Sequence, residues 1–216
     1  MKAKQFPCSV VVALIAVSSL GAETMIPDLT AIPSGKGWKG AVSALTLTEK
    51  DGAPAVTSKG NAVVWLDGFE FTNGVIEFDG KGKSAPPQSN FMGITFRVVD
   101  EKTHDVVYFR PFNFRADSAD RRSHSVQYAS HPDWGWERLR QERPGQYEKA
   151  IEPAPDGDAW FHAKVVVEKP KVSVFVNEAS VPSLVVNEIT SRKGGSVGLY
   201  FFASGTIANL KVTPTP

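Results

Sequence analysis

The sequence predicts an all-β protein built as an antiparallel sandwich of two sheets. About ten short stretches rich in Val, Ile, Phe, Tyr and Thr follow one another, with Gly, Pro, Asn or Asp turns between them. No stretch after the N-terminal leader shows a convincing 3.6-residue apolar period, which an amphipathic helix would have. Many closely spaced strands without helices are typical of two packed antiparallel sheets. We therefore expect a β-sandwich.

The first residues of the chain predict a secretory signal peptide. Lys2 and Lys4 precede an apolar run over residues 10–17, and small residues follow as far as Ala22. The run is shorter than the ~20 residues that span a bilayer, so we expect no membrane insertion. We expect residues 1–22 to be removed, residues 23–216 to form a single domain, and the protein to reach the periplasm or the exterior.

Composition limits the chemistry and the partners of the exported chain. The single cysteine, Cys8, lies in the leader before its apolar run, a position that does not fit a lipoprotein anchor. The mature chain then has no disulfide, no thiolate nucleophile and no thiolate metal site. Removing Lys2 and Lys4 from the 24 basic residues leaves 22 against 23 acidic ones. This balance gives no reason to expect nucleic acid or an anionic membrane as a partner. The oligomeric state stays open.

The strands of the N-terminal half are identified from alternating residues and from the turns between them. Residues 23–36 are rich in Pro and Thr and predict an extended lead-in. Residues 74–79 alternate apolar and polar side chains, as a half-buried strand does, and a Gly, Pro and Ser loop follows over 81–90. The strands expected in this half are 38–47, 62–66, 74–79 and 91–99.

In the C-terminal half, one proline and one long segment interrupt the pattern. Pro111 has no amide hydrogen, so the strand predicted over 106–115 meets an edge, a bulge or its end there. After a short strand at 125–128, an irregular segment reaches Asp158, and segments of this length are usually functional or disordered. Its Trp and Tyr residues favour an ordered segment. The remaining strands expected are 160–168, 171–177, 196–203 and 206–213.

Several chemically distinctive residues are assigned to ordinary structural roles. Large aromatic residues within or beside the strands are expected mainly in the core: Trp65, Phe69, Phe71, Trp160, Phe161 and Phe175. His104 and His162 are expected to be structural or solvated.

The order of the strand sequences carries a family resemblance. GVIEFD, GITFR, YFRPFNFR, WFHAKVVVE with KVSVFVN, and GGSVGLYFFASGTIANLKV together resemble the concanavalin A-like lectin/glucanase superfamily. Within it, the chain looks most like the secreted bacterial proteins of the 3-keto-disaccharide hydrolase domain family. The resemblance covers most of the mature chain and implies a concanavalin A-like jelly roll that acts on a sugar.

The resemblance also suggests a test of the strand at 74–79. Laminarinase-like members carry their nucleophile and acid on one strand as Glu-x-Asp-x-Glu, a spacing that places the carboxylates on one face. Here Gly80, Lys81 and Gly82 follow Asp79, so the second glutamate is missing. Glu77 and Asp79 are therefore expected to be exposed strand residues.

Candidate binding residues concentrate between residues 97 and 147. This stretch holds eight of the nine arginines and three of the four histidines. The planar fork of Arg grips a carboxylate or a vicinal diol through two parallel hydrogen bonds. Tyr108 and Arg110 share one strand face, and with Arg97 they line a concave face if their strands are neighbours. The alternative is a set of surface ion pairs. Further binding candidates are Asn113, Arg115 and Gln127.

The catalytic candidates are the titratable side chains of the same stretch. His124 and His131 are candidates because His is the commonest general base, and Glu137 is a candidate acid. The alternatives are structural histidines and glutamates neutralised by neighbouring arginines. The spacing of the histidines is no metal signature, and no cofactor is implied.

Trp134 and Trp136 predict a platform on which the apolar face of a sugar ring stacks, unless both indoles fill a gap beneath the segment. Our leading hypothesis is a secreted glycoside-hydrolase-like enzyme with a carbohydrate substrate. The alternatives are a non-catalytic carbohydrate-binding module and an accessory envelope protein.

Overall fold

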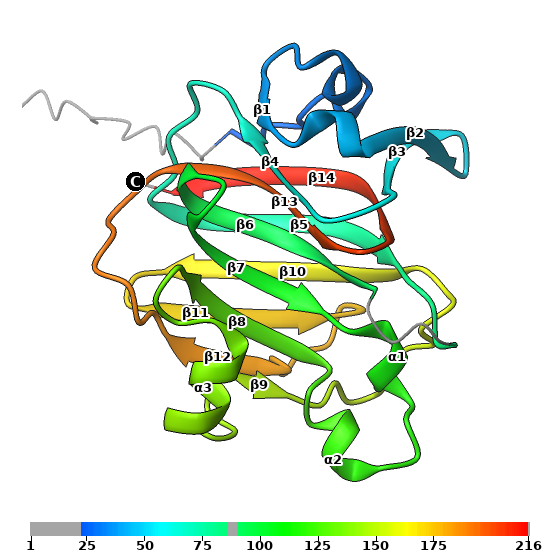
Figure 1. Cartoon of the computed structure of the whole chain (residues 1–216), viewed down its shortest axis with the longest axis vertical. Helices are drawn as coiled ribbons and strands as arrows, with labels where there is room; N and C mark the ends of the chain where they lie inside the picture. Colours follow the sequence, from blue (N-terminus) through cyan, green and yellow to red (C-terminus); the bar gives the residue numbers. More distant parts are fainter. Residues whose placement is uncertain (1–22, 86–89, 216) are drawn as a thin grey trace, which may run out of the picture.

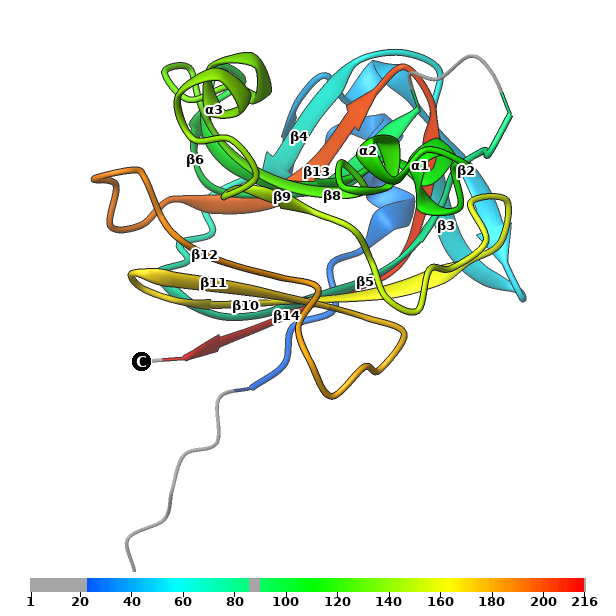
Figure 2. The same cartoon turned by 90° about the horizontal axis from the view of Figure 1, so that it is seen from below.

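Two antiparallel sheets of seven strands each are stacked face to face in this computed structural model, which describes residues 23–85 and 90–215 (Figures 1 and 2). The first sheet has the order β1-β4-β13-β6-β7-β8-β9, and the second has the order β12-β11-β10-β5-β14-β3-β2. The predicted two-sheet jelly roll is confirmed. The predicted signal peptide, residues 1–22, lies outside the described residues. Within the described part of the chain, no helix is long and apolar enough to cross a membrane.

The strands of the first sheet are β1 (Trp38–Gly40), β4 (Ala62–Leu66), β6 (Phe91–Asp100), β7 (Thr103–Phe109), β8 (Val126–His131), β9 (Glu148–Lys149) and β13 (Ser196–Phe202). Those of the second sheet are β2 (Leu45–Lys50), β3 (Ala53–Ser58), β5 (Asn73–Lys81), β10 (Phe161–Glu168), β11 (Lys171–Val176), β12 (Leu184–Asn187) and β14 (Gly205–Thr215). The helical turns are η1 (Leu29–Ser34), η2 (Val42–Ala44), α1 (Pro111–Phe114), α2 (Ala119–Arg122) and α3 (Trp136–Glu142).

The strand predicted over 38–47 is in fact two strands in different sheets. Gly40 has a φ of 90°, and a Cβ at this position would clash with the carbonyl oxygen of Val63. The chain leaves the first sheet after Gly40, forms η2 and enters the second sheet as β2. Sequence reasoning also missed β3 and β12. In β3, Pro54 suggested a turn, but a proline next to the first residue of a strand is tolerated.

The strand predicted over 106–115 ends at Phe109, because Pro111 begins α1. Proline fits the first turn of a helix, where an amide hydrogen has no helical partner. The long segment that follows β8 is also more regular than predicted, since it contains α3 and β9.

The core lies between the inner faces of the sheets and follows the two-residue period of the strands. Val107 and Phe109 of β7 and Val126 and Tyr128 of β8 are fully buried there. Of the aromatic residues predicted for the core, Phe71 and Phe161 are fully buried, whereas Trp65, Phe69, Trp160 and Phe175 are only half-buried.

A network of buried ion pairs joins the two sheets at one end. Arg97 follows Phe96 where the register of β6 and β7 shifts, and its φ is 51°. Its guanidinium donates to Oε1 of Glu188 from Nε (3.1 Å) and Nη2 (2.6 Å), and also to the carbonyl of Lys193. Because Arg97 lies on β6 and Glu188 directly follows β12, this pair ties the two layers together.

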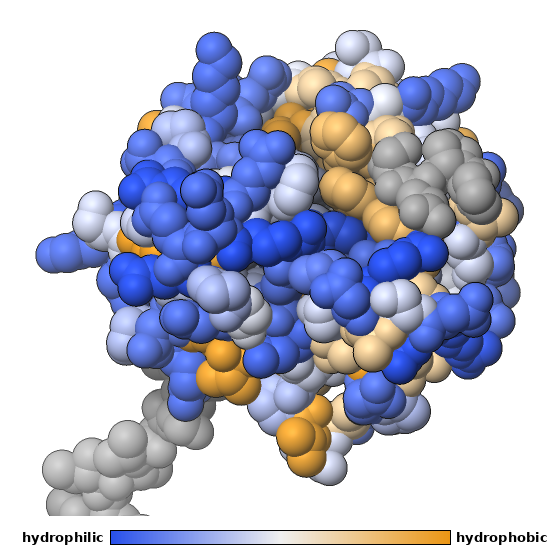
Figure 3. All heavy atoms as spheres, turned by 60° about the horizontal axis from the view of Figure 1, so that its bottom comes forward, coloured by the Kyte–Doolittle hydropathy of each residue, from blue (hydrophilic) through white to orange (hydrophobic). Residues whose placement is uncertain are grey.

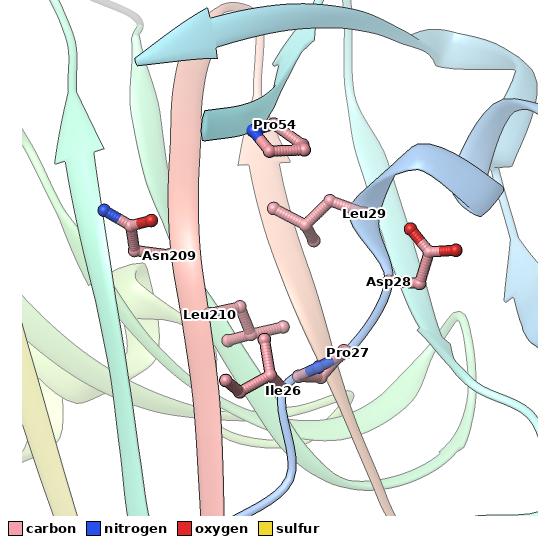
Figure 4. A pocket seen from close by; sticks show the side chains of 7 residues that line it. All are labelled: Ile26, Pro27, Asp28, Leu29, Pro54, Asn209 and Leu210. Atoms are coloured by element: carbon pink, nitrogen blue, oxygen red, sulfur yellow. The ribbon is translucent and has the colours of Figure 1, made fainter. Parts of the chain in front are cut away.

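The lead-in packs along β14, where Met25 and Val212 exchange two backbone hydrogen bonds of 2.8 and 2.9 Å. A hollow of about 200 Å³ lies beside it, lined largely by apolar residues of the lead-in, β3 and β14 (Figure 4). Its charged lining residue, Asp28, accepts hydrogen bonds from Thr30 at the start of η1. This hollow is therefore a packing feature with few groups available to a ligand.

The buried pair makes a stability prediction. Replacing Arg97 by Met should lower the free energy of unfolding by about 3 kcal/mol, because Glu188 keeps a buried charge without its main partner. Urea denaturation measures the change. The double variant Arg97→Met/Glu188→Met should recover much of the loss.

Arg115→Met is the matched control, since Arg115 pairs with Asp156 at 3.1 Å with both side chains about half exposed. It should cost no more than about 1 kcal/mol. Equal losses in Arg97→Met and Arg115→Met would contradict the stabilising role assigned to the buried pair.

Candidate functional site

The outer face of the first sheet carries most of the residues that the sequence suggested. This sheet is curved, and α3 stands over one end of its outer face while α1 and α2 stand over the other (Figure 2). Tyr108 on β7, Gln127 on β8 and Glu148 on β9 form one cross-strand row on that face. Gly93 of β6 continues the row, and its missing side chain leaves the rings of Tyr108 and Tyr200 free to approach to 5.5 Å.

Arg110 is fixed in this row by hydrogen bonds from both ends of its guanidinium. Nη2 donates to the hydroxyl of Tyr108 at 2.8 Å and to Oε1 of Gln127, and Nη1 donates to the carbonyl of His124 at 2.9 Å. The Tyr108 hydroxyl donates in turn to Gln127 at 2.9 Å. Burial raises the pKa of Tyr108, so this hydroxyl stays protonated. Tyr108 and Gln127 therefore form a buried polar layer that holds Arg110 in place.

Glu148 is the electrostatic centre of the site. Its carboxylate accepts two hydrogen bonds of 2.8 Å from Arg140, lies 2.8 Å from Nδ1 of His124, and lies 3.5 Å from Nη1 of Arg110. Burial disfavours the charged form, but the hydrogen bonds from Arg140 and the charges of Arg140, His124 and Arg110 outweigh it. The pKa of Glu148 therefore lies below its ordinary value, and the group stays ionised at neutral pH.

His124 lies at the edge of this cluster, between α2 and β8. Its side chain is 19% exposed, with Nδ1 directed at Glu148 and Nε2 3.8 Å from the exposed Asp120. The side chain of the neighbouring Asn113 donates to the carbonyl of His124 at 3.3 Å and accepts from Arg121. These two bonds tie α1 to α2 and to the residue that precedes β8. One nitrogen of the imidazole thus lies against a carboxylate, while the other lies on the side of the more exposed Asp120.

A hollow of about 350 Å³ opens directly beside His124. It is lined by Phe91, Arg110, Phe112, Asn113, His124, Trp136, Arg140 and Phe202. Phe91 stacks on Phe202 with ring centroids 5.2 Å apart and lies 5.6 Å from Phe112. In Figure 3, which views the molecule obliquely from the side of α3, a patch of apolar residues borders a band of strongly hydrophilic ones. The hollow therefore combines an aromatic wall with cationic and imidazole groups.

The segment between β8 and β9 forms the other wall of the hollow through Trp136 and Arg140. Trp136 begins α3, is 42% exposed, and has the Arg140 guanidinium 4.9 Å from its ring centroid. Trp134 is different, because it packs against the cluster of Val106, Tyr108, Ala129 and Leu139 and lies beneath the guanidinium of Arg138 at 3.9 Å. Trp136 is thus the indole positioned to meet a ligand, and Trp134 supports the segment.

The prediction that Arg97 lines the same concave face is wrong. Alternation along β6 would have placed it outward after the inward Phe96, but the register shift turns it into the sandwich. There it is 0% exposed and is bound to Glu188, so no ligand on the outer face reaches it.

Three other predicted residues lie outside the hollow. Arg115 is held at the surface by Asp156 and the carbonyl of Ala154. Glu137 is exposed in the first turn of α3. His131 lies with its ring 5.1 Å from that of His104, and burial together with the charge of Arg192 lowers its pKa. His124, Tyr108, Arg110, Asn113, Gln127 and Trp136 are the predicted residues that the fold brings together.

Sequence reasoning missed several residues of the site. Glu148 is one of the glutamates that the sequence suggested were neutralised by neighbouring arginines, and it was not singled out as a site residue. The pKa of Glu148 is lowered. Arg140, Phe91, Phe112 and Phe202 were also missed. The YFF run at 200–202 offered one signal, because the period of two separates an inward Phe201 from an outward Phe202.

Metal binding has no obvious location. Within residues 23–85 and 90–215, no group of three or more His, Cys, Asp or Glu side chains is arranged to hold an ion.

Comparison with known families identifies the fold's relatives. Residues 33–209 match the model of the 3-keto-alpha-glucoside-1,2-lyase-like domain. The chain belongs to this family. The resemblance inferred from the strand sequences is thereby confirmed. No curated protein matches the chain in sequence.

Solved structures similar to this chain are sandwiches of low sequence identity. The carbohydrate-binding module CBM66 from Bacillus subtilis is 13% identical, with a TM-score of 0.57 over 82% of this chain and 96% of that chain. A galectin-like protein of unknown function from Bacillus subtilis is 14% identical, with a TM-score of 0.53 over 82% and 89%. The kappa-carrageenase from Pseudoalteromonas carrageenovora is 10% identical, with a TM-score of 0.53 over 94% and 98%. At these identities the likeness is one of fold.

The buried His104 on this face makes stability depend on pH. Burial and the neighbouring His131 lower the pKa of His104 from 6.5 to about 4. Between these values the unfolded chain binds a proton that the folded chain does not, so stability falls as the pH falls from about 6.5 to about 4. The contribution reaches at most about 1.4 kcal/mol per pH unit.

Urea denaturation from pH 7 to pH 4 measures this effect. The variant His104→Gln should show a shallower loss of stability over that interval than the wild type, whatever its stability at pH 7. Identical slopes in the two proteins would show that His104 is not buried in its neutral form.

Proposed function

We propose that the chain is an enzyme that cleaves 3-keto-α-glucosides by elimination, with His124 as the general base. The observation that carries the proposal is the His124 imidazole, which contacts the ionised Glu148 at 2.8 Å and borders the aromatic hollow. The negative charge of a carboxylate beside Nδ1 favours a proton on that nitrogen, which leaves Nε2 to accept a proton.

Elimination from a 3-keto sugar requires only one general base. The ketone at C3 acidifies the hydrogen at C2, so His124 Nε2 can take this proton while the C2–H electron pair forms an enolate with C3. The enolate then collapses, a double bond forms between C1 and C2, and the C1–O bond to the leaving group breaks. Protonated His124 returns the proton to the departing oxygen, which restores the base.

Cations beside the base would stabilise the enolate oxygen. Arg140 uses Nε and Nη2 to bind Glu148, and no hydrogen bond within the described structure occupies its Nη1. Arg110 adds positive charge at the floor of the same hollow. Donors that are held in place before the reaction cost little reorganisation when negative charge develops.

This mechanism fits the acidic residues of the site better than hydrolysis by two carboxylates. A retaining or inverting glycosidase needs two carboxyl groups on either side of the bond that breaks. Among the residues lining the hollow none is a carboxylate, and Glu148 behind them is neutralised by two arginines. We therefore assign no acid role to Glu137 and no base role to His131.

Substrate binding would use the aromatic wall and the polar groups of the hollow. Phe91, Phe202 and Trp136 offer apolar surface to the C–H faces of a sugar ring, and Asn113 with the arginines offers hydrogen bonds to its hydroxyls. A signal peptide over residues 1–22, as the sequence predicts, would carry this activity to the periplasm or outside the cell.

A non-catalytic sugar-binding module is the second candidate, because carbohydrate-binding module CBM66 shares the fold. Such a module would bind an ordinary sugar and its keto form alike and would leave the glycosidic bond intact.

The first test replaces His124 by Gln. The variant should lose elimination of a 3-keto-α-glucoside by about 10²-fold or more in kcat, while ligand binding stays within a few-fold. Release of the leaving sugar measures turnover, and exchange of the C2 hydrogen in D₂O measures proton removal by itself. His131→Gln, on the same face but outside the hollow, is the matched control and should keep near-normal activity.

The elimination mechanism would be wrong if the wild type cleaves the unoxidised α-glucoside as readily as its 3-keto form. Binding of both sugars without turnover of either would support the module instead.

Trp136 gives a separate test of substrate binding. Trp136→Ala should raise KM about 3- to 10-fold and leave kcat within about twofold, because stacking stabilises the bound sugar and the transition state alike. Trp134→Phe keeps the packing beneath Arg138 and should leave KM nearly unchanged. An unchanged KM in Trp136→Ala would remove α3 from the binding site.

A further inference from the structure

A second polar cluster lies on the outer face of the other sheet. Asp79 of β5 and His162 of β10 face each other across the sheet, and Glu77 pairs with Lys164 in the next row on this face. These strands form the lower layer in Figure 2, on the side of the molecule opposite α1, α2 and α3. The cluster is therefore separate from the hollow beside His124.

The centre of this cluster is a buried carboxylate that positions an imidazole. Asp79 is 8% exposed and accepts hydrogen bonds from Lys50 (2.8 Å), Asn209 (2.6 Å) and Nδ1 of His162 (2.8 Å). Three donors from β2, β14 and β10 thus converge on one anion, which is far more than an exposed strand carboxylate needs. Sequence analysis predicted an exposed Asp79, and that prediction is wrong.

The ring held by Asp79 faces an open hollow. Because Nδ1 of His162 binds Asp79, the other nitrogen, Nε2, is directed at Glu77, 3.5 Å away. Both side chains are about one-third exposed and line a hollow of about 390 Å³. Its other lining residues are Lys164, Phe175, Glu178, Ala179 and Ser180. The volume lies within the range of about 300–1,000 Å³ that is usual for small-molecule sites.

A strained turn completes the rim of this hollow. Asn177 and Glu178 follow β11 with φ of 51° and 59°, and the amide of Ala179 closes the turn on the carbonyl of Val176. Residues other than Gly, Asn and Asp rarely adopt this left-handed conformation, so Glu178 carries a local cost. Asn177 anchors the turn by accepting from the amide of His162 at 2.9 Å. The loop after this turn projects from the outer side of the lower layer (Figure 2).

We propose that this hollow is a second saccharide-binding site that takes a neutral sugar. Glu77, Glu178 and His162 offer acceptors and a donor to neighbouring hydroxyls, and the half-buried Phe175 offers an apolar surface to the C–H face of the ring. A free anion is disfavoured by the two glutamates. A cation gains little, because Lys164 stands between Glu77 and Phe175 and already offsets the negative charge.

The site does not depend on the activity proposed for His124. It would hold a second sugar, or another part of the same glycan, on the opposite face of the sandwich.

The test is a titration of the ¹⁵N-labelled protein with a panel of neutral mono- and disaccharides, followed by amide chemical shifts. At least one sugar should shift amides of β5 and β10 together with residues 177–180. Glu77→Gln and Phe175→Ala should each weaken this binding about tenfold or more, with the rest of the spectrum unchanged as evidence of folding. His124→Gln is the matched control and should leave these shifts intact.

The proposal fails if no sugar in the panel shifts these amides, or if all shifts map to the hollow beside His124. It also fails if only glucosamine or glucuronate, added as charged analogues, binds at these residues. Loss of catalysis in His124→Gln has no bearing on this result, so the two proposals are tested separately.

Discussion

The candidate active site is assembled around the buried negative charge of Glu148. Arg140 reaches it from α3, Arg110 from the end of β7, and His124 from the chain between α2 and β8. All three of these side chains come from residues outside the strand ladders, and β9, which carries Glu148, has only two residues. A buried carboxylate loses its hydration and is stable only beside charged or hydrogen-bonding groups. The burial of Glu148 therefore favours the arrangement in which all three side chains meet. The geometry of the hollow then follows from electrostatics as much as from the sheet.

The two faces of β7 and β8 carry two separate polar networks. On the inner side, Asp105 and Ser130 receive hydrogen bonds from Arg192, next to the pair of Arg97 and Glu188. On the outer side, the buried Tyr108 and Gln127 hold Arg110, which lines the hollow. Both networks come from the same two strands and face opposite sides of the sheet, so a register slip of one residue would exchange their faces.

The sequence predicted the parts of the site that depend on local periodicity. Tyr108 and Arg110 do meet on one face, where the Arg110 guanidinium donates to the Tyr108 hydroxyl just after β7 ends. The same argument failed for Arg97, since a register shift is a property of the strand pairing that the residues of β6 alone do not reveal.

Long-range contacts were beyond prediction for a related reason. Phe91 and Phe202 stack although they are far apart in the chain, and their contact depends on β6 pairing with β13. The helix α3 has only seven residues and a single buried one, Leu139, so its sequence has no apolar period that would predict a helix. Which of several arginines would meet Glu148 depended on that helix. The fold class could therefore be predicted from the chain, whereas the membership of the site could be predicted only in part.

Gly93 and Gly198 lie on the outer face of the first sheet, and a Cβ at either would collide with a backbone carbonyl, of Val107 and Val64 respectively. Neither position can acquire a side chain without breaking the sheet. Substitutions at these two positions of the outer face are therefore excluded, and changes in binding specificity have to come from residues at the rim of the hollow. There the exposed positions of α1, α2 and α3 lie outside the strand ladders, which makes them the positions where substitutions can reshape the hollow and leave both sheets intact.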